Sequence, residues 1–355
     1  MIDRMKPRTF NRRQVLALGA AAAGIAAAKL PGAEAAAPNK GGRIRMGLTS
    51  SSTADSLDPA TWSSSIMQIG FSGGVYNCLS EVAENGELIP ELAEGWEASS
   101  AGGAKTWIFR LRKGVEFHNG KTMDAEDVIA SINYHRGENS KSAAKSIVAA
   151  IADIRADGKD TVVFELSTAN ADFPFLLSDY HLVIAPANGG NPDWQAAIGT
   201  GGYRIVENEP GVRLSLKRQP NYWKADRAHF DEAELIAIGD ITARQTALIT
   251  GKVDVINKVD LRTVHLLQRE GIVIEEVTGT QHISMPMNST LAPFDNNDVR
   301  LALKLAIDRE ALVRTILRGH ERVANDHPIS PSNRYFAAAL PQRTYDPDKA
   351  RYHLN

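Results

Sequence analysis

Apolar and polar residues alternate in several short segments of the chain, and this period of two is typical of β-strands. The clearest segment is 106–112, where Trp107, Phe109 and Leu111 would share one face of a sheet. Further strands are predicted at 43–48, 161–166, 203–205, 212–217 and 253–256. Strands are therefore expected along most of the chain.

Between these strands the apolar residues change to helical spacing. Asp124 is a good N-cap, and Ala125, Val128 and Ile132 follow it at the spacing of one helix face. Further helices are predicted at about 65–80, at 242–250, in two pieces over 298–317 with Asp308 capping the second, and from 345 onwards. Because strands and helices mix from end to end, the pattern indicates an α/β or α+β fold.

The first 37 residues have the pattern of an export signal. Five basic residues within 1–14 precede an uncharged run at 15–28, which is shorter than the ~20 residues that span a membrane. Arg12 and Arg13 stand just before that run and resemble a twin-arginine signal, although Asn11 and Val15 depart from its usual residues. Residues 1–37 are predicted to be an export signal of this type, with ordinary secretion as the alternative. The mature protein is then expected to be periplasmic and soluble.

Composition narrows the classes of function. Lys and Arg number 40 against 42 Asp and Glu, and this formal charge of −2 argues against nucleic acid as a partner, because phosphate binding needs a basic face. The single cysteine, Cys78, excludes an intramolecular disulfide framework and a multi-cysteine metal site. The nine histidines form no metal-binding motif, so neither a metal nor a cofactor is predicted. The acid-rich segment 81–97 is expected to be a solvated face.

A series of short sequence blocks, in a fixed order, covers nearly all of the chain after residue 37. The most specific is WIFRLRKGVEFHNGK at 107–121, which AEDV follows at 125–128. The others are LDP at 57–59, VYNCL at 75–79, PELAEGWE at 90–97, GTGGY at 199–203, NYW at 221–223, GKVD at 251–254, VRLA at 299–302, AIDR at 306–309 and YDPDKA at 345–350. Together they resemble the extracytoplasmic solute-binding proteins of family 5, the dipeptide- and oligopeptide-binding components of ABC importers. Gly202 departs from the proline that is common in its block.

The resemblance implies an α/β clamshell of the class II periplasmic-binding-protein type. Its first lobe would be built from 38–77 and 199–281, with 78–198 inserted as a subdomain, and 282–355 would begin a second lobe that is incomplete. Members of the family are longer than this chain, which is therefore expected to be a fragment or a natural truncation. The aspartate that anchors a peptide's amino group in the family would lie beyond Asn355.

The resemblance also implies a binding protein rather than an enzyme. The expected function is that of a periplasmic receptor, which binds peptides or similar small solutes and delivers them to the permease subunits of an ABC importer in the inner membrane. Such a receptor closes around its ligand at a hinge. No catalytic residue and no cofactor are implied, and the chain is expected to be a monomer.

Eight residues are candidates for contact with the ligand: Ser51, Ser52, Thr53, Tyr76, Asn77, Met285, Met287 and Asn288. The polar loop after the first strand would form a wall of the cleft, with an ordinary solvated turn as the alternative. Tyr76 and Asn77 would add an aromatic face and an amide, with helix packing as the alternative. The two methionines would pack adaptably against ligands at a hinge crossing over 282–288. Alternatively, they are core residues of a strand.

One motif points to another class of function. Residues 70–74, GFSGG, satisfy G-x-S-x-G, the nucleophile elbow of serine hydrolases. That elbow needs a buried strand before the serine and a helix after it, whereas SSSIMQ at 63–68 makes a poor strand. A secreted serine hydrolase that uses Ser72 is the alternative function.

Overall fold

The computed structural model describes residues 39–99, 103–277, 282–324, 326, 329–331 and 333–355. The chain divides into two units, Met1–Lys40 and Gly41–Asn355, and every helix and strand described below belongs to the second. The expected export signal at 1–37 lies outside the described residues.

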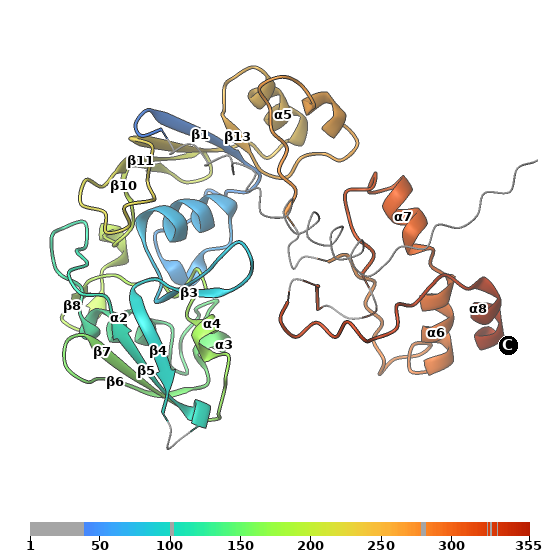
Figure 1. The fold of residues 1–355 in the computed structure, drawn as a ribbon, viewed down its shortest axis with the longest axis horizontal. Coiled ribbons are helices and arrows are strands. Elements are labelled where there is room, and N and C mark those ends of the chain that lie inside the picture. Colours follow the sequence, from blue (N-terminus) through green and yellow to red (C-terminus); the bar gives the residue numbers. More distant parts are fainter. Residues whose placement is uncertain (1–38, 100–102, 278–281, 325, 327–328, 332) are drawn as a thin grey trace, which may run out of the picture. The chain divides into compact units, whose positions relative to one another are not determined.

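The larger sheet has five strands in the order β10-β11-β12-β1-β13. Figure 1 labels β1, β10, β11 and β13 of this sheet. The strands are β1 (Arg43–Leu48), β10 (Tyr203–Glu209), β11 (Arg213–Arg218), β12 (Glu232–Ala237) and β13 (Val255–Ile256). β1 lies between β12 and β13 and runs parallel to both, whereas β11 is antiparallel to β10 and to β12. The carboxyl ends of β1, β12 and β13 therefore meet at one edge of the sheet.

The predicted helix over 65–80 is shorter than expected and has a different winding. It is η2, a nine-residue π-helix at Met67–Val75, and the chain is extended again at Tyr76. Gly70 lies so close to the sheet that an added Cβ would meet Leu214 Cδ2 at 2.4 Å. The glycines that bring η2 onto the sheet are also poor helix formers, so the helix ends early.

A second sheet has four antiparallel strands in the order β4-β5-β7-β6. The strands are β4 (Ala93–Ala98), β5 (Thr106–Leu111), β6 (Ile151–Ala156) and β7 (Thr161–Leu166). The helix α2 (Ala125–Tyr134) packs on β6 and β7, and Asp124 caps it in a capping box with Asp127. The predicted strand at 106–112 and the predicted cap at Asp124 are thus confirmed.

The remaining elements complete the described part of the chain. They are η1 (Pro59–Thr61), β2 (Ser80–Val82), β3 (Leu88–Pro90), η3 (Gly103–Lys105), α3 (Lys145–Val148), α4 (Phe173–Leu176), β8 (Ala187–Asn188), β9 (Asn191–Pro192), η4 (Trp194–Ala196), α5 (Ile241–Ile249), η5 (Val264–Leu267), α6 (Asn297–Ala306), α7 (Arg309–Thr315) and α8 (Pro347–Leu354). The helices α6 and α8 pack against each other. In the described part of the chain, no helix has the length and apolar character needed to cross a membrane.

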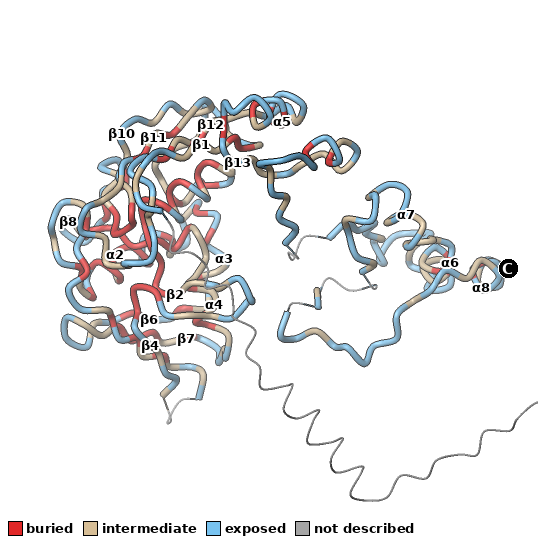
Figure 2. Tube along the Cα trace, turned by 45° about the horizontal axis from the view of Figure 1, so that its top comes forward, coloured by how far each residue is buried: buried red, intermediate tan, exposed pale blue. Residues whose placement is uncertain are grey.

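Each sheet has its own hydrophobic core. Phe109, Phe164 and Phe173 centre the core of the four-stranded sheet, and all three are fully buried. Trp62 and Phe71, whose rings lie 5.2 Å apart, belong to the core of the five-stranded sheet. Figure 2 shows the buried residues gathered around the two sheets, whereas α6, α7 and α8 carry mostly exposed and intermediate residues.

Candidate functional site

The candidate site is the set of loops that follow the parallel strands β1, β12 and β13. These loops are 49–55, 238–240 and 257–258. In open α/β sheets, ligands bind outside the carboxyl ends of the strands. The polar loop that contains Ser51, Ser52 and Thr53 thus lies where the sheet topology favours a ligand.

Asp55 fixes the shape of this polar loop. Its Oδ2 accepts hydrogen bonds from Ser51 Oγ at 2.9 Å, from the Ser52 backbone N–H at 3.0 Å and from Ser64 Oγ at 2.9 Å. Ser52 and Thr53 are exposed, and Ser51 is half-buried. The loop is therefore an ordered turn whose outer residues face solvent.

A cluster of hydroxyl and amide groups adjoins the loop. Ser50 Oγ lies 2.8 Å from Ser65 Oγ and accepts a 2.8 Å hydrogen bond from the Ser65 backbone N–H. Thr49 donates its backbone N–H to Asn257 Oδ1 at 2.9 Å, and Asn257 Nδ2 lies 3.4 Å from Ser65 Oγ. We call Thr49, Ser50, Ser65 and Asn257 the hydroxyl cluster. Groups of this kind both donate and accept hydrogen bonds, so the cluster suits a polar, uncharged part of a solute.

Sequence reasoning did not single out Thr49, Ser65 or Asn257. A signal was nevertheless present, because Thr49 and Asn257 directly follow the predicted strands at 43–48 and 253–256. Polar residues at the carboxyl ends of two strands that prove to be parallel neighbours are expected to meet. The sequence alone did not indicate that β1 pairs with β13.

The side chains of Tyr76 and Asn77 make their contacts with residues outside the polar loop. The Tyr76 ring is fully buried with Trp62 and Trp194 at 5.9 and 6.0 Å between ring centroids, and burial raises the pKa of its hydroxyl. Asn77 donates to Glu91 Oε1 at 2.7 Å and accepts from Thr200 Oγ1 at 2.9 Å. Among the described residues, no hydrogen bond joins either side chain to residues 49–55.

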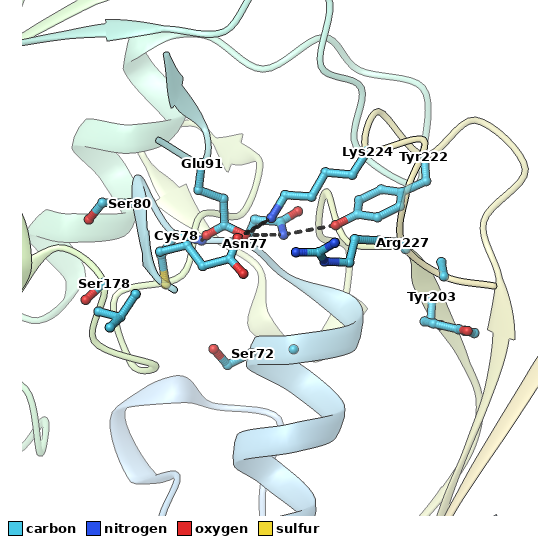
Figure 3. Close-up of a pocket in the computed structure, with 15 residues that line it drawn as sticks. Ser72, Asn77, Cys78, Ser80, Glu91, Ser178, Tyr203, Tyr222, Lys224 and Arg227 are labelled. Atoms are coloured by element: carbon cyan, nitrogen blue, oxygen red, sulfur yellow. Dashed lines mark hydrogen bonds and ion pairs between the residues drawn. The ribbon is translucent and has the colours of Figure 1, made fainter. Parts of the chain in front are cut away.

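Asn77 instead lines a cavity of about 380 Å³ (Figure 3). Lys224 Nζ reaches into it and lies 2.8 Å from Glu91 Oε1 and 2.7 Å from Glu81 Oε2. Glu91 Oε2 accepts the Cys78 backbone N–H at 2.8 Å. Glu81, Glu91 and Lys224, which all line the cavity, are therefore already paired with one another.

Burial governs the titration of this buried ion pair. Burial raises the pKa of Glu91, and the nearby charge of Lys224 offsets only part of this rise. Burial alone would lower the pKa of Lys224, but Glu91 and Glu81 raise it overall.

The expectation that 81–97 is a solvated face is wrong for Glu91, which is 7% exposed, because Lys224 and the Cys78 amide allow its carboxylate to be buried. We interpret this network as a structural junction, and we place the candidate site at the polar loop and the hydroxyl cluster.

Ser72 does not have the setting of a hydrolase nucleophile. It lies in the middle of η2, whereas the elbow needs the serine on a sharp turn between a strand and a helix. The described residues that line the cavity beside Ser72 include no histidine. The alternative of a serine hydrolase that uses Ser72 is therefore wrong.

Met285, Met287 and Asn288 lie in a segment, 282–288, that forms neither helix nor strand. Met285 is 66% exposed and Met287 is half-buried. Asn288 is exposed, and its Oδ1 accepts the backbone N–H and the hydroxyl of Thr290 at 3.0 and 2.8 Å. The alternative that the methionines are core residues of a strand is wrong. Among the described residues, no hydrogen bond joins Met285, Met287 or Asn288 to the hydroxyl cluster.

Comparison with known proteins gives one family. The sequence model of the bacterial extracellular solute-binding proteins, family 5, matches residues 87–355. The nickel-binding periplasmic protein of Escherichia coli is 28% identical over 290 residues, which cover 78% of this chain and 54% of that protein. The dipeptide-binding protein of the same species is 26% identical over 332 residues, which cover 85% of this chain and 61% of that protein.

A solved structure shares the fold. The periplasmic binding protein DppA from Helicobacter pylori, in complex with the peptide STSA, matches with a TM-score of 0.71 at 23% identity. The match covers 89% of this chain and 66% of that one. The α/β fold is therefore that of periplasmic binding proteins, as expected from the sequence. The chain spans about 54–61% of the length of the two relatives.

Proposed function

Because the chain belongs to family 5 of the bacterial extracellular solute-binding proteins, we propose that it is the ligand-binding receptor of an ABC importer. The family match over 87–355 carries this proposal. The receptor binds its solute without chemical change and delivers it to permease subunits in the inner membrane. It is a monomer in the periplasm.

The ligand is a peptide or a similar small polar solute. Two relatives are named for nickel and for dipeptides, so the scaffold alone does not select the ligand. The hydroxyl cluster supports a solute that offers both hydrogen-bond donors and acceptors, as a peptide backbone does. Of the candidates from the sequence, Ser51, Ser52 and Thr53 fit this role best because they lie at the carboxyl edge of the sheet.

The other candidates have different roles in the proposal. Met285, Met287 and Asn288 lie on the hinge crossing from the first lobe, 38–77 with 199–281, to the second lobe, which begins at 282. Met285 is exposed and Met287 is half-buried, and flexible methionine side chains on a hinge can pack against ligands of varied shape. Tyr76 and Asn77 have a packing role in the proposal, because their side chains are buried and bond or pack away from the polar loop.

Thermal unfolding of the chain with defined solutes tests the receptor proposal. The probes are dipeptides, the tetrapeptide Ser-Thr-Ser-Ala and a nickel salt, each in wide excess. A ligand at a hundredfold excess over its Kd stabilises by about 2.7 kcal/mol. Replacing Ser50→Ala and Ser65→Ala together is expected to reduce the shift, whereas Ser72→Ala, a serine outside the hydroxyl cluster, should retain it. Stability that none of these solutes changes would count against the proposal.

Residues 1–37 direct the protein to the twin-arginine export route in this proposal. The paired Arg12 and Arg13 before the apolar run support it. Replacing both with lysine should leave uncleaved protein in the cytoplasm, as cell fractionation would show. Unchanged export of this variant would indicate ordinary secretion instead.

A further inference from the structure

Arg244 on α5 is a buried cation that is held by backbone carbonyls. The residue is only 2% exposed. Its Nε donates to the Asn257 carbonyl at 3.0 Å, and one terminal nitrogen donates to the carbonyls of Ile238 and Gly239 at 2.7 and 3.2 Å. The other terminal nitrogen donates to the Lys258 carbonyl at 2.9 Å. A buried charge is tolerated only when its hydrogen bonds are made, so these four carbonyls are what allow Arg244 to be there.

The four carbonyls come from two different loops at the candidate site. Residues 238–239 follow β12, and residues 257–258 follow β13. These strands lie on either side of β1, so the guanidinium group joins the loops that flank the end of β1. The fork of donors on arginine suits this task, because it can bind several acceptors in fixed directions.

The backbone at this point is held in an uncommon conformation. Lys258 has φ of +51°, a left-handed conformation that is unfavourable for a residue other than glycine. Arg244 binds the carbonyl of this same residue. Such a conformation persists when its surroundings fix it, and the bond from Arg244 is one of the contacts that do so.

Asn257 connects the arginine to the hydroxyl cluster. Its carbonyl accepts from Arg244, and its side chain binds Thr49 and Ser65. We propose that Arg244 is a positioning residue, which holds Asn257 and through it the hydroxyl cluster in the geometry that meets the ligand. The inference rests on the proposed receptor function only in treating this cluster as the ligand-facing wall.

Amide hydrogen exchange tests the proposal without any ligand. In Arg244→Met, the Thr49 amide, which donates to Asn257 Oδ1, should exchange at least about tenfold faster. Amides of β5, in the other sheet, should keep their rates. Asn257→Ala removes the partner of Thr49 directly and sets the scale of the effect. The matched control is Gln245→Met, because Gln245 is the next residue of α5, is also buried, and bonds only to Thr263 among the contacts described.

Chemical rescue gives a second test. Arg244→Ala leaves the four carbonyls without their cation, so low millimolar guanidinium should restore slow exchange at Thr49, and ammonium should not.

Unchanged exchange at Thr49 in Arg244→Met, or acceleration that is equal in β5, would overturn the proposal. If the Met variant does not fold, Arg244→Lys decides, because local acceleration supports the positioning role and wild-type exchange refutes it. If no solute binds, the receptor function is refuted. The exchange measurements still decide whether Arg244 positions Asn257, because they need no ligand.

Discussion

Glu91 and Lys224 are charged side chains that the fold holds away from water. Their side chains are 9% and 14% exposed, and their ion pair measures 2.8 Å. Moving a charged group out of water costs free energy, and this cost is offset only when the charge has a partner in the interior. Lys224 therefore joins the loop at 222–228 to the chain around β2 and β3.

Replacing Lys224→Met is expected to destabilise the protein by about 3–5 kcal/mol, because Glu91 would be left buried without its cation. The loss should be larger at pH 8 than at pH 5, since Glu91, whose pKa burial raises, can take up a proton at the lower pH. Urea unfolding measures the effect. The control is Arg110→Met, which breaks a pair with Glu97 that is about half exposed and should cost less than about 1 kcal/mol. Equal losses in the two variants would contradict the prediction.

His135 should make stability depend on pH. The residue is fully buried, its Nδ1 lies 2.6 Å from Ser142 Oγ, and burial lowers its pKa from 6.5 to about 4. The unfolded chain binds this proton below pH 6.5 and the folded chain does not, so stability falls as the pH drops from 6.5 to 4, by up to about 3 kcal/mol.

The variant His135→Asn lacks the titrating nitrogen, so its stability should fall less over that range. Urea midpoints at pH 6.5 and 4.5 would show the difference. His265→Asn, which changes an exposed histidine, should behave as the wild type does. An unchanged slope in His135→Asn would refute this account.

At the scale of elements, close backbone packing joins η2 to the segment at 199–201. A Cβ added to Gly199 would lie 2.0 Å from the Val75 carbonyl oxygen, and one added to Gly201 would lie 2.2 Å from the Gly74 carbonyl oxygen. Backbone atoms cannot move aside as the end of a side chain can. These two glycines are therefore required by contact rather than by a turn.

Gly199→Ala is expected to destabilise by about 2–3 kcal/mol, because the methyl group would force the segment away from η2. Gly73→Ala is the matched control, since a Cβ at that position meets nothing within 4 Å. Its effect should be near zero or slightly stabilising, because alanine favours a helix over glycine. Thermal unfolding of both variants would measure this, and similar midpoints for the two would contradict the close approach.

Local sequence patterns predicted the strands that alternate cleanly or are rich in apolar and β-branched residues, and the helices that begin with an aspartate cap. The strands β5, β7 and β11 and the caps at Asp124 and Asp308 are confirmed. The strands β4, β6 and β12 were missed, because they are rich in alanine, aspartate and glutamate, which are depleted in strands. They are strands because neighbouring strands pair with them, and pairing is not a local property.

The candidate site divides in the same way. The polar loop at 50–53 is visible in the sequence as polar residues directly after an alternating strand. The contact of Asn257 with Ser65 is not visible, because it joins residues 192 positions apart. The burial of Glu91 was missed for a similar reason, since its partner Lys224 is 133 positions away. Long-range partners thus decided which polar residues belong to the site and which to the interior.

At the scale of the molecule, the two sheets have separate hydrophobic cores. A domain unfolds as one cooperative unit only when its parts cannot lose structure independently. Because the cores are separate, we expect a substitution in one core to destabilise its own sheet more than the other sheet.

Phe164→Ala and Leu214→Ala remove one fully buried side chain from each core. Each should cost about 2–5 kcal/mol. Hydrogen exchange in Phe164→Ala should accelerate more in β5–β7 than in β11 and β12, and Leu214→Ala should give the reverse pattern. Uniform acceleration in both variants would show that the two sheets unfold together.

The parallel pairing of β1 with β12 also has a consequence for synthesis of the chain. Gly42 and Asp231, which bond at the start of this pair, are separated by 189 positions. A ribosome adds about 5–20 residues per second, so β1 waits roughly 10–40 s for its partner. The strands of the smaller sheet all lie within 93–166 and can pair during that delay. During this interval the nascent chain exposes an unpaired strand edge. That edge can pair with another chain and aggregate unless a chaperone binds it first.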